Sequence, residues 1–198
     1  LLWSGIVPPD RAKQLVERLF QPDLWCGWGI RTLSAKHPAY DPIGYHTGSV
    51  WAHDNSFIAT GLKHYGYHAE ANRIAEGIFA AASMFQSNQM PELFGGIDRL
   101  PEKFPVPYVD ANIPQAWAAG AMPWLISSIL GLVADAHHHR LQVQPVLPDW
   151  LPDLHLTHLN VGDATVDLRF WREGEQTQWE ITHLKGKLDV ATSKIDIY

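Results

Sequence analysis

The spacing of apolar residues changes part-way along the chain, and this change limits the possible folds more than any other feature of the sequence. In the first two-thirds, apolar side chains recur every three to four residues, so that Ile74 and Ile78 share one face of an expected helix. From about residue 140 apolar and polar residues alternate instead, as around Val166 and Leu168, which is the period of a strand. We therefore expect a mainly α fold with a small β appendage.

Four segments carry the helical period. They are residues 9–20, 55–65, 67–86 and 113–131. The last is apolar almost all round, with Trp117 and Trp124 among its side chains, and a helix without a polar face is expected to be buried on all sides. The pattern predicts a helical domain over residues 1–136, followed by a domain over 137–198 made of a small antiparallel sheet of four or five strands.

Two long segments between the expected helices, 21–53 and 87–112, are rich in glycine, proline and aromatic residues. Loops of this length are usually functional or disordered, and their aromatic content argues against disorder. We therefore expect these loops to build a site at one end of a helical array.

Composition excludes several classes of protein. The chain has 15 basic and 21 acidic residues, a net charge of −6, and no basic stripe that could neutralise a nucleic acid backbone. No apolar run approaches the roughly 20 residues that a membrane span needs. Cys26 is the only cysteine, so no intrachain disulfide can form, and a reducing, cytoplasmic location is expected.

The eleven histidines raise the question of a metal site. Three of them are consecutive, 137–139, and neighbours in a row do not converge on one ion, while His64 and His68 are separated by Gly66. The chain has no H-E-x-x-H arrangement and none of the glycine patterns that bind nucleotides. No metal and no other cofactor is expected.

The segment 44–55 (GYHTGSVWAHDN) is polar, aromatic and rich in glycine, and a helix is expected directly after it. Asp54 occupies a position suited to an N-cap, which needs only a side-chain oxygen. Alternatively, Trp51, His53 and Asp54 face a ligand in the loop layer. The two interpretations are compatible and both stay open.

Glu92 is a single carboxylate among proline, leucine and phenylalanine in the segment 89–96. Desolvation would raise its pKa and suit it to act as a general base, whereas the simpler interpretation is a buried glutamate held by backbone amides. Farther along, Asn112 could cap the apolar helix, and Gln115 and Trp117 would point towards the loops as a hydrogen-bonding group and a stacking surface. With nine Trp and six Tyr in the chain, some aromatic side chains could stack on sugar rings, although most are expected in the core.

These segments, in this order, resemble one family. The set consists of W-G-I-R-T-L from residue 28, Y-H-T-G-S-V-W from 45, P-E-L-F from 91, P-Q-A-W-A-A-G from 114, and L-P, W-L-P and V-G-D-A between 147 and 164. It is similar to the C-terminal half of bacterial amylo-α-1,6-glucosidases, or glycogen-debranching-type proteins, over nearly the whole chain.

The resemblance implies part of an (α/α)6 barrel, the six-hairpin glycosidase architecture, with about four of its twelve helices in this chain. It implies inverting hydrolysis of an α-linked glucoside in an oligosaccharide or polysaccharide, as in carbohydrate metabolism, with Glu92 as the general base. The general acid is expected in an upstream segment of the family that this chain lacks, so the isolated chain is not expected to hydrolyse efficiently. Its apolar helix faces would pack against an upstream barrel half or self-associate.

Two other interpretations stay open. The chain could be a carbohydrate-binding or interaction module without catalysis, or a structural domain whose apolar helix faces pack against a partner. The sequence names neither the sugar, nor the linkage, nor the oligomeric state.

Overall fold

The computed structural model describes residues 1–192, which divide into two compact units, the first spanning Leu1–Ile126 and the second beginning at Ser127. Helix makes up 30% of the structure, in four helices, and strand makes up 24%, in three sheets. The expected mainly α fold is therefore wrong, and the fold is a mixed α/β fold. The long loops of the first unit take up chain that further helices would need, while three strands of the second unit are nine or ten residues long.

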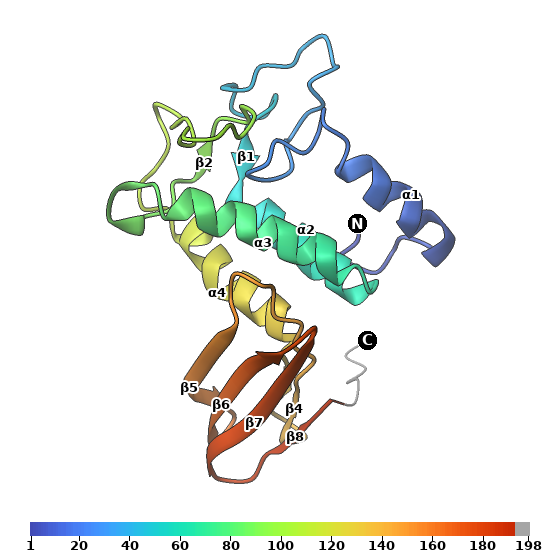
Figure 1. Cartoon of the computed structure of the whole chain (residues 1–198), viewed down its shortest axis with the longest axis vertical. Helices are drawn as coiled ribbons and strands as arrows, with labels where there is room; N and C mark the ends of the chain where they lie inside the picture. The colour runs from blue at the N-terminus through green and yellow to red at the C-terminus, as the bar shows by residue number, and fades with distance from the viewer. Residues whose placement is uncertain (193–198) are drawn as a thin grey trace. The chain divides into compact units, whose positions relative to one another are not determined.

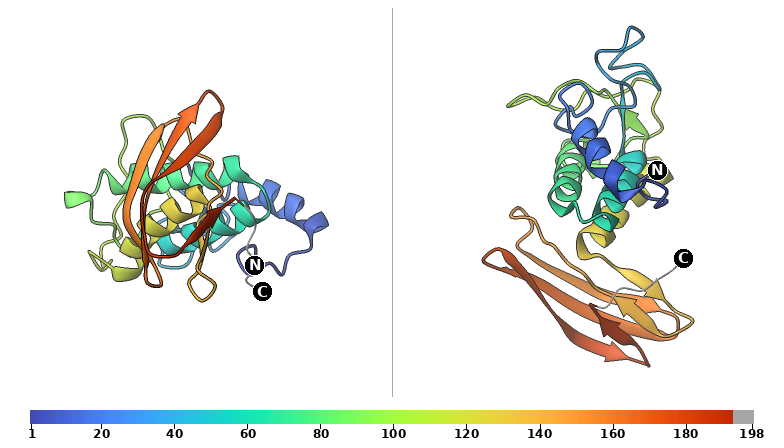
Figure 2. Two further views of the ribbon diagram at one scale, coloured as in Figure 1. Left: turned by 90° about the horizontal axis from the view of Figure 1, so that it is seen from below. Right: turned by 90° about the vertical axis from the view of Figure 1, so that its right-hand side faces the viewer.

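The four helices start within a few residues of the expected positions. They are α1 (Pro9–Leu19), α2 (Ala52–His64), α3 (His68–Ala82) and α4 (Ala116–Leu130). A tight turn joins α2 to α3, in which the N–H of Gly66 donates to Lys63 O and the N–H of Tyr67 donates to Leu62 O. Gly66 has a φ of +84°, which only glycine adopts easily. The turn folds α3 back along α2, and Figures 1 and 2 show the two helices side by side.

Helix α4 is only partly buried, which corrects the expectation of burial on all sides. Leu125 and Ile129 are buried, but Trp117 is 57% exposed and Trp124 is 42% exposed. The exposed tryptophans lie seven residues apart, two turns along one face. Trp124 Nε1 donates to Thr60 Oγ1 of α2 (2.7 Å), which keeps this face of α4 close to α2. Among residues 1–192, no helix is both long enough and apolar enough to cross a membrane.

A two-stranded ribbon joins the two long loops of the first unit. Strand β1 (Val50–Trp51) pairs antiparallel with β2 (Leu93–Phe94), so that Trp51 lies opposite Leu93. A short 3-10 helix (Gln86–Asn88) precedes β2. The buried Arg31 fastens the same loops, because its Nε donates to Gly96 O (2.6 Å). The ribbon thus brings together segments that are about forty residues apart in the chain.

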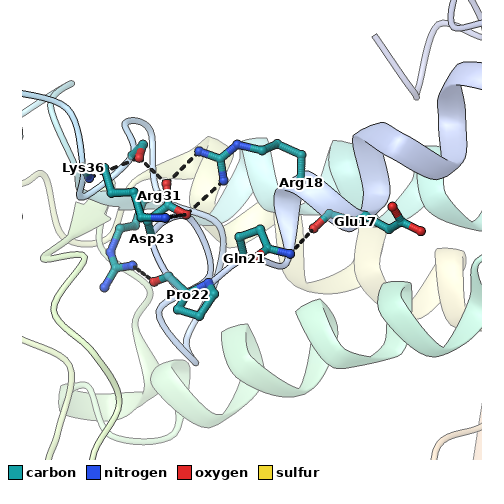
Figure 3. Close-up of polar contacts among 8 residues, drawn as sticks. Glu17, Arg18, Gln21, Pro22, Asp23, Arg31 and Lys36 are labelled. Atoms are coloured by element: carbon teal, nitrogen blue, oxygen red, sulfur yellow. Dashed lines mark hydrogen bonds and ion pairs between the residues drawn. The ribbon is translucent and has the colours of Figure 1, made fainter.

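A second polar cluster fixes the point where α1 enters the first long loop (Figure 3). Both carboxylate oxygens of Asp23 accept hydrogen bonds from the guanidinium of Arg18, at 3.0 and 2.6 Å. The hydroxyl of Ser34 donates to the same carboxylate, and Lys36 Nζ lies 3.9 Å from it. This cluster holds the loop against the end of α1.

The second unit contains two three-stranded sheets. Strands β5 (Asp153–Val161), β6 (Ala164–Glu173) and β7 (Gln176–Lys185) form an antiparallel sheet, seen side by side in Figure 1. The other sheet has the order β3 (Val133–Asp135), β4 (Arg140–Gln142) and β8 (Asp189–Ala191). The expectation of one antiparallel sheet is therefore wrong: β4 and β8 pair in parallel, because the whole β5–β7 sheet connects them.

The period-two alternation of β6 determines which of its side chains enter the core of this unit. Val166, Leu168 and Phe170 are fully buried, while the intervening Asp167 and Arg169 are partly exposed. Leu141 of β4 is buried as well. The alternation in the sequence was therefore a sound guide to the strand and to its buried face.

Candidate active site

Glu92 lies directly before β2, at the point where the ribbon joins the two long loops. Pro91 and Leu93 on either side are buried, whereas Glu92 itself is partly exposed. Because Leu93 pairs with Trp51, the carboxylate lies next to the end of β1 and the start of α2. Strand pairing thus places Glu92 beside the segment 44–55.

Both oxygens of the Glu92 carboxylate accept hydrogen bonds from neutral donors. The hydroxyl of Tyr45 donates to Oε1 (2.6 Å), and Nδ2 of Asn112 donates to Oε2 (3.1 Å). The backbone N–H of Glu92 also donates to Asn112 O (3.1 Å). The carboxylate is therefore fixed in orientation, while each oxygen keeps a further lone pair that can accept another hydrogen.

These hydrogen bonds act on the pKa of Glu92 in the direction opposite to the one expected from its sequence. The hydrogen bond from Tyr45 lowers the pKa of the Glu92 carboxyl below its ordinary value, and this outweighs the opposing effect of burial. The same bond raises the pKa of the Tyr45 hydroxyl. The predicted increase in the Glu92 pKa by desolvation is wrong, because the proline, leucine and phenylalanine around it leave the carboxylate partly open to water and to donors.

Aromatic contacts hold the ring of Tyr45 in place. It packs edge-on against Trp51 (centroids 4.8 Å apart) and also touches Tyr108 (5.6 Å). Trp51 Nε1 donates to Tyr45 O (3.0 Å), and the ring of His46 stacks on Trp51 at 5.3 Å. Trp51 is only 7% exposed, so Tyr45 packs against a ring that is itself fixed in the core.

His53, in the first turn of α2, is 4% exposed and lies near enough to Glu92 for the carboxylate to influence its pKa. Its imidazole stacks on Trp117 of α4, with centroids 3.9 Å apart and planes 13° apart. Burial lowers the pKa of His53, opposed by the charges of Asp54 and Glu92. Among the residues that the structure describes, Nδ1 of His53 is buried without a hydrogen-bond partner.

Asp54 is not an N-cap, because α2 begins two residues earlier and its N-cap position is Trp51. The Asp54 side chain is 57% exposed, with Oδ1 3.7 Å from Nε2 of His53. Capping is instead seen at α4, where the side-chain oxygen of Gln115 accepts from the N–H of Ala118 (2.7 Å). The expected cap, Asn112, binds Glu92.

The structure thus brings together Glu92, Trp51, His53 and Trp117, with Asp54 at the edge and Gln115 at the start of α4. Sequence reasoning assigned no role to Tyr45 and took Asn112 for a cap. Tyr45 opens the aromatic segment already singled out, but only the pairing of β1 with β2 shows that this segment meets Glu92. Among residues 1–192, no group of three His, Cys, Asp or Glu side chains could hold a metal ion.

Residues 2–95 match the model of a protein family described as the mannosylglycerate hydrolase MGH1-like glycoside hydrolase domain. This part of the chain is similar to a glycoside hydrolase domain. The match includes Tyr45, Trp51, His53 and Glu92, and it supports glycosidase chemistry on a carbohydrate without singling out amylo-α-1,6-glucosidase. No curated protein matches the chain.

Proposed function

We propose that this chain supplies the general base of an inverting glycoside hydrolase, and that the base is Glu92. The observation that carries the proposal is the carboxylate held at both oxygens by neutral donors, within the part of the chain that matches a glycoside hydrolase domain. The general acid would come from a segment outside this chain, so we expect low activity from the chain alone.

An inverting glycosidase needs one carboxylate that stays ionised and takes a proton from water. The neutral donors meet the first requirement for Glu92, because they favour its charged form, and they leave its negative charge uncancelled for the proton transfer. The hydrogen bonds from Tyr45 and Asn112 also hold the carboxylate in one orientation, so that a remaining lone pair can face the attacking water.

For the sugar itself, the most suitable stacking surface is Trp117, which is exposed and backed by His53. Sugar rings stack their C–H groups on such aromatic faces. His53 would position the Trp117 ring, with Asp54 and Gln115 at the edge of the same site and Trp51 holding Tyr45.

The substrate we propose is an α-linked glucoside, of the kind that amylo-α-1,6-glucosidases and debranching enzymes cleave. The name of the matched family makes a mannosyl-glycerate the second candidate. Both classes can be tested by incubating the complete protein with isomaltose, a linear maltooligosaccharide and mannosylglycerate, and following the released sugar by NMR.

Early release of β-glucose from an α-glucoside is the result we expect, because inversion changes the anomeric configuration. Release of α-glucose would contradict the inverting mechanism. Cleavage of mannosylglycerate alone would contradict the debranching-type substrate while leaving the role of Glu92 intact.

The exposed face of α4 supports a proposal about partners. Beyond the proposed sugar site, Trp124 of α4 and Trp3 both contact Phe57 (5.8 and 5.1 Å) and leave an aromatic surface in contact with water. We propose that further helices of the same protein, or a second copy of the chain, cover this surface.

The exposed Trp117 also keeps a second function open, that of a carbohydrate-binding module without catalysis. The two functions separate in a sugar titration followed by tryptophan fluorescence. Binding that depends on Trp117, together with no turnover of any tested glycoside by the complete protein, would favour the binding module.

A further inference from the structure

A hollow lies in the first unit and shares no residue with the Glu92 site. Its volume is about 220 Å³, and its lining residues are Trp25, Gly27, Arg73, Glu76, Gly77 and Arg99. This is far more than one water molecule needs. Two guanidinium groups and one carboxylate among six lining residues give the hollow an unusual chemistry for a protein with a net charge of −6.

Both arginines of this hollow are ordered by stacking on aromatic rings. The guanidinium of Arg73 lies over Trp25 (4.7 Å) and Phe20 (5.3 Å), and that of Arg99 lies over Trp28 (4.6 Å). Stacking uses the face of a guanidinium and leaves the N–H groups at its edge available. Within residues 1–192, neither guanidinium is engaged in an ion pair.

Close backbone packing fixes the positions from which the two arginines extend. The N–H of Arg99 donates to Cys26 O (2.7 Å). A side chain at Gly27, which has a φ of +89°, would approach Cβ of Arg99 to 2.7 Å, and one at Gly77 would approach Trp28 O to 2.4 Å. Both glycines are therefore needed where three segments meet around the hollow.

We propose that this hollow binds a phosphate monoester of a small polyol or sugar. Guanidinium groups donate well to phosphate oxygens, and because stacking already orders Arg73 and Arg99, little side-chain freedom is lost when they bind. Glu76 repels a bare anion but can accept hydrogen bonds from hydroxyl groups. The site thus favours a phosphate that carries a hydroxylated carbon chain over inorganic phosphate.

Isothermal titration calorimetry of the whole chain with glucose 6-phosphate, inorganic phosphate and glucose tests this proposal. We expect saturable 1:1 binding of glucose 6-phosphate, weaker binding of inorganic phosphate, and no binding of glucose at this site. Absence of saturable binding of both phosphates up to about 10 mM would overturn the proposal.

Variants locate the binding. Arg73→Gln and Arg99→Gln should each weaken binding of glucose 6-phosphate about 10-fold, because each removes charge-assisted hydrogen bonds. Glu76→Gln should strengthen binding of inorganic phosphate, because it removes a repulsive charge. Arg11→Gln, on α1 and away from the hollow, makes the same change in net charge and should have little effect.

If Arg11→Gln weakened binding of glucose 6-phosphate as much as Arg73→Gln and Arg99→Gln do, net charge alone would explain the binding. That result would contradict a binding site in the hollow. Circular dichroism of each variant confirms that the exposed substitutions leave the fold intact. Because the readout is binding, the result does not depend on whether Glu92 is a catalytic base.

Discussion

Asp23 and Glu92 are two carboxylates of the same unit whose pKa values both lie below the ordinary range, but for different physical reasons. The side chain of Asp23 is 5% exposed and held by the guanidinium of Arg18 and the hydroxyl of Ser34 (Figure 3). Glu92 is partly exposed and held by a phenol and an amide, both neutral.

This difference distinguishes a carboxylate that stabilises the fold from one that can still react. At Asp23 a cation cancels the charge, and further donors occupy the oxygens, so the group holds the chain in place. At Glu92 the donors fix the geometry but leave a net negative charge with free lone pairs. A lowered pKa alone therefore does not identify a functional carboxylate, whereas the charge of its partners separates the two cases.

The first way to sharpen this comparison is Asp23→Asn, for which we expect the largest loss of folding stability. The substitution leaves the guanidinium of Arg18 with a neutral partner, and it removes the negative charge that also attracts Lys36. Urea unfolding followed by circular dichroism measures the loss. Asp10→Asn, at an exposed ion pair with Arg11, is the matched control and should change stability little.

The pH dependence of unfolding has a definite sign at Asp23. Because the folded pKa is depressed, its contribution is fully present above the ordinary aspartate pKa of about 3.9 and is lost as pH falls below it. Asp23→Asn should flatten this acid decline. An unchanged acid decline in the variant would show that the ion pair does not stabilise the fold.

The second prediction concerns Tyr45→Phe, which removes the donor to Glu92 and keeps the ring. Turnover in the complete protein should fall about 10-fold, because a hydrogen bond to a charged group is lost. Since the bond lowers the pKa of Glu92, its loss should also move the acid limb of the pH–rate profile to higher pH.

Tyr108→Phe is the control for this prediction, because Tyr108 touches the ring of Tyr45 without bonding Glu92. It should leave the acid limb where it is. An equal shift in both variants would mean that general disturbance of the loops, and not the Tyr45 bond, sets the pKa of Glu92.

The smallest expected effect is that of Trp117→Ala on substrate binding. Loss of the exposed ring should raise KM by about 3- to 10-fold with little change in kcat, because stacking contributes modestly to binding. Trp124→Ala, two turns farther along the same helix, is the control. If KM rose equally in Trp117→Ala and Trp124→Ala, Trp117 would not be a specific contact of the sugar.

The sequence predicted structure best where a regular spacing of apolar residues continues over a long segment. The helices and β6 follow from runs of ten or more residues in which apolar positions repeat. The fold class was not predictable, because it depends on how much chain the loops take and on the parallel pairing of β8 with β4, which requires partners far apart in sequence.

The sequence indicated which residues belong to the candidate site, but it did not predict which of them contact one another. Glu92 and Trp51 stood out by composition, and the structure brings them together through a ribbon of only two residues per strand, too short to show a period. The roles of Asn112 and Gln115 were exchanged, because either amide can cap a helix and only the fold decides which one reaches it.

The measurement that tests the central claim most directly is turnover of an α-glucoside by the complete protein with Glu92→Gln, compared with Glu102→Gln at an exposed position outside the site. Glutamine keeps the size of the side chain but cannot take a proton from water. We predict a loss of about 1,000-fold for Glu92→Gln, with sugar binding and folding retained, and no loss for Glu102→Gln. Retained turnover in Glu92→Gln would contradict the account.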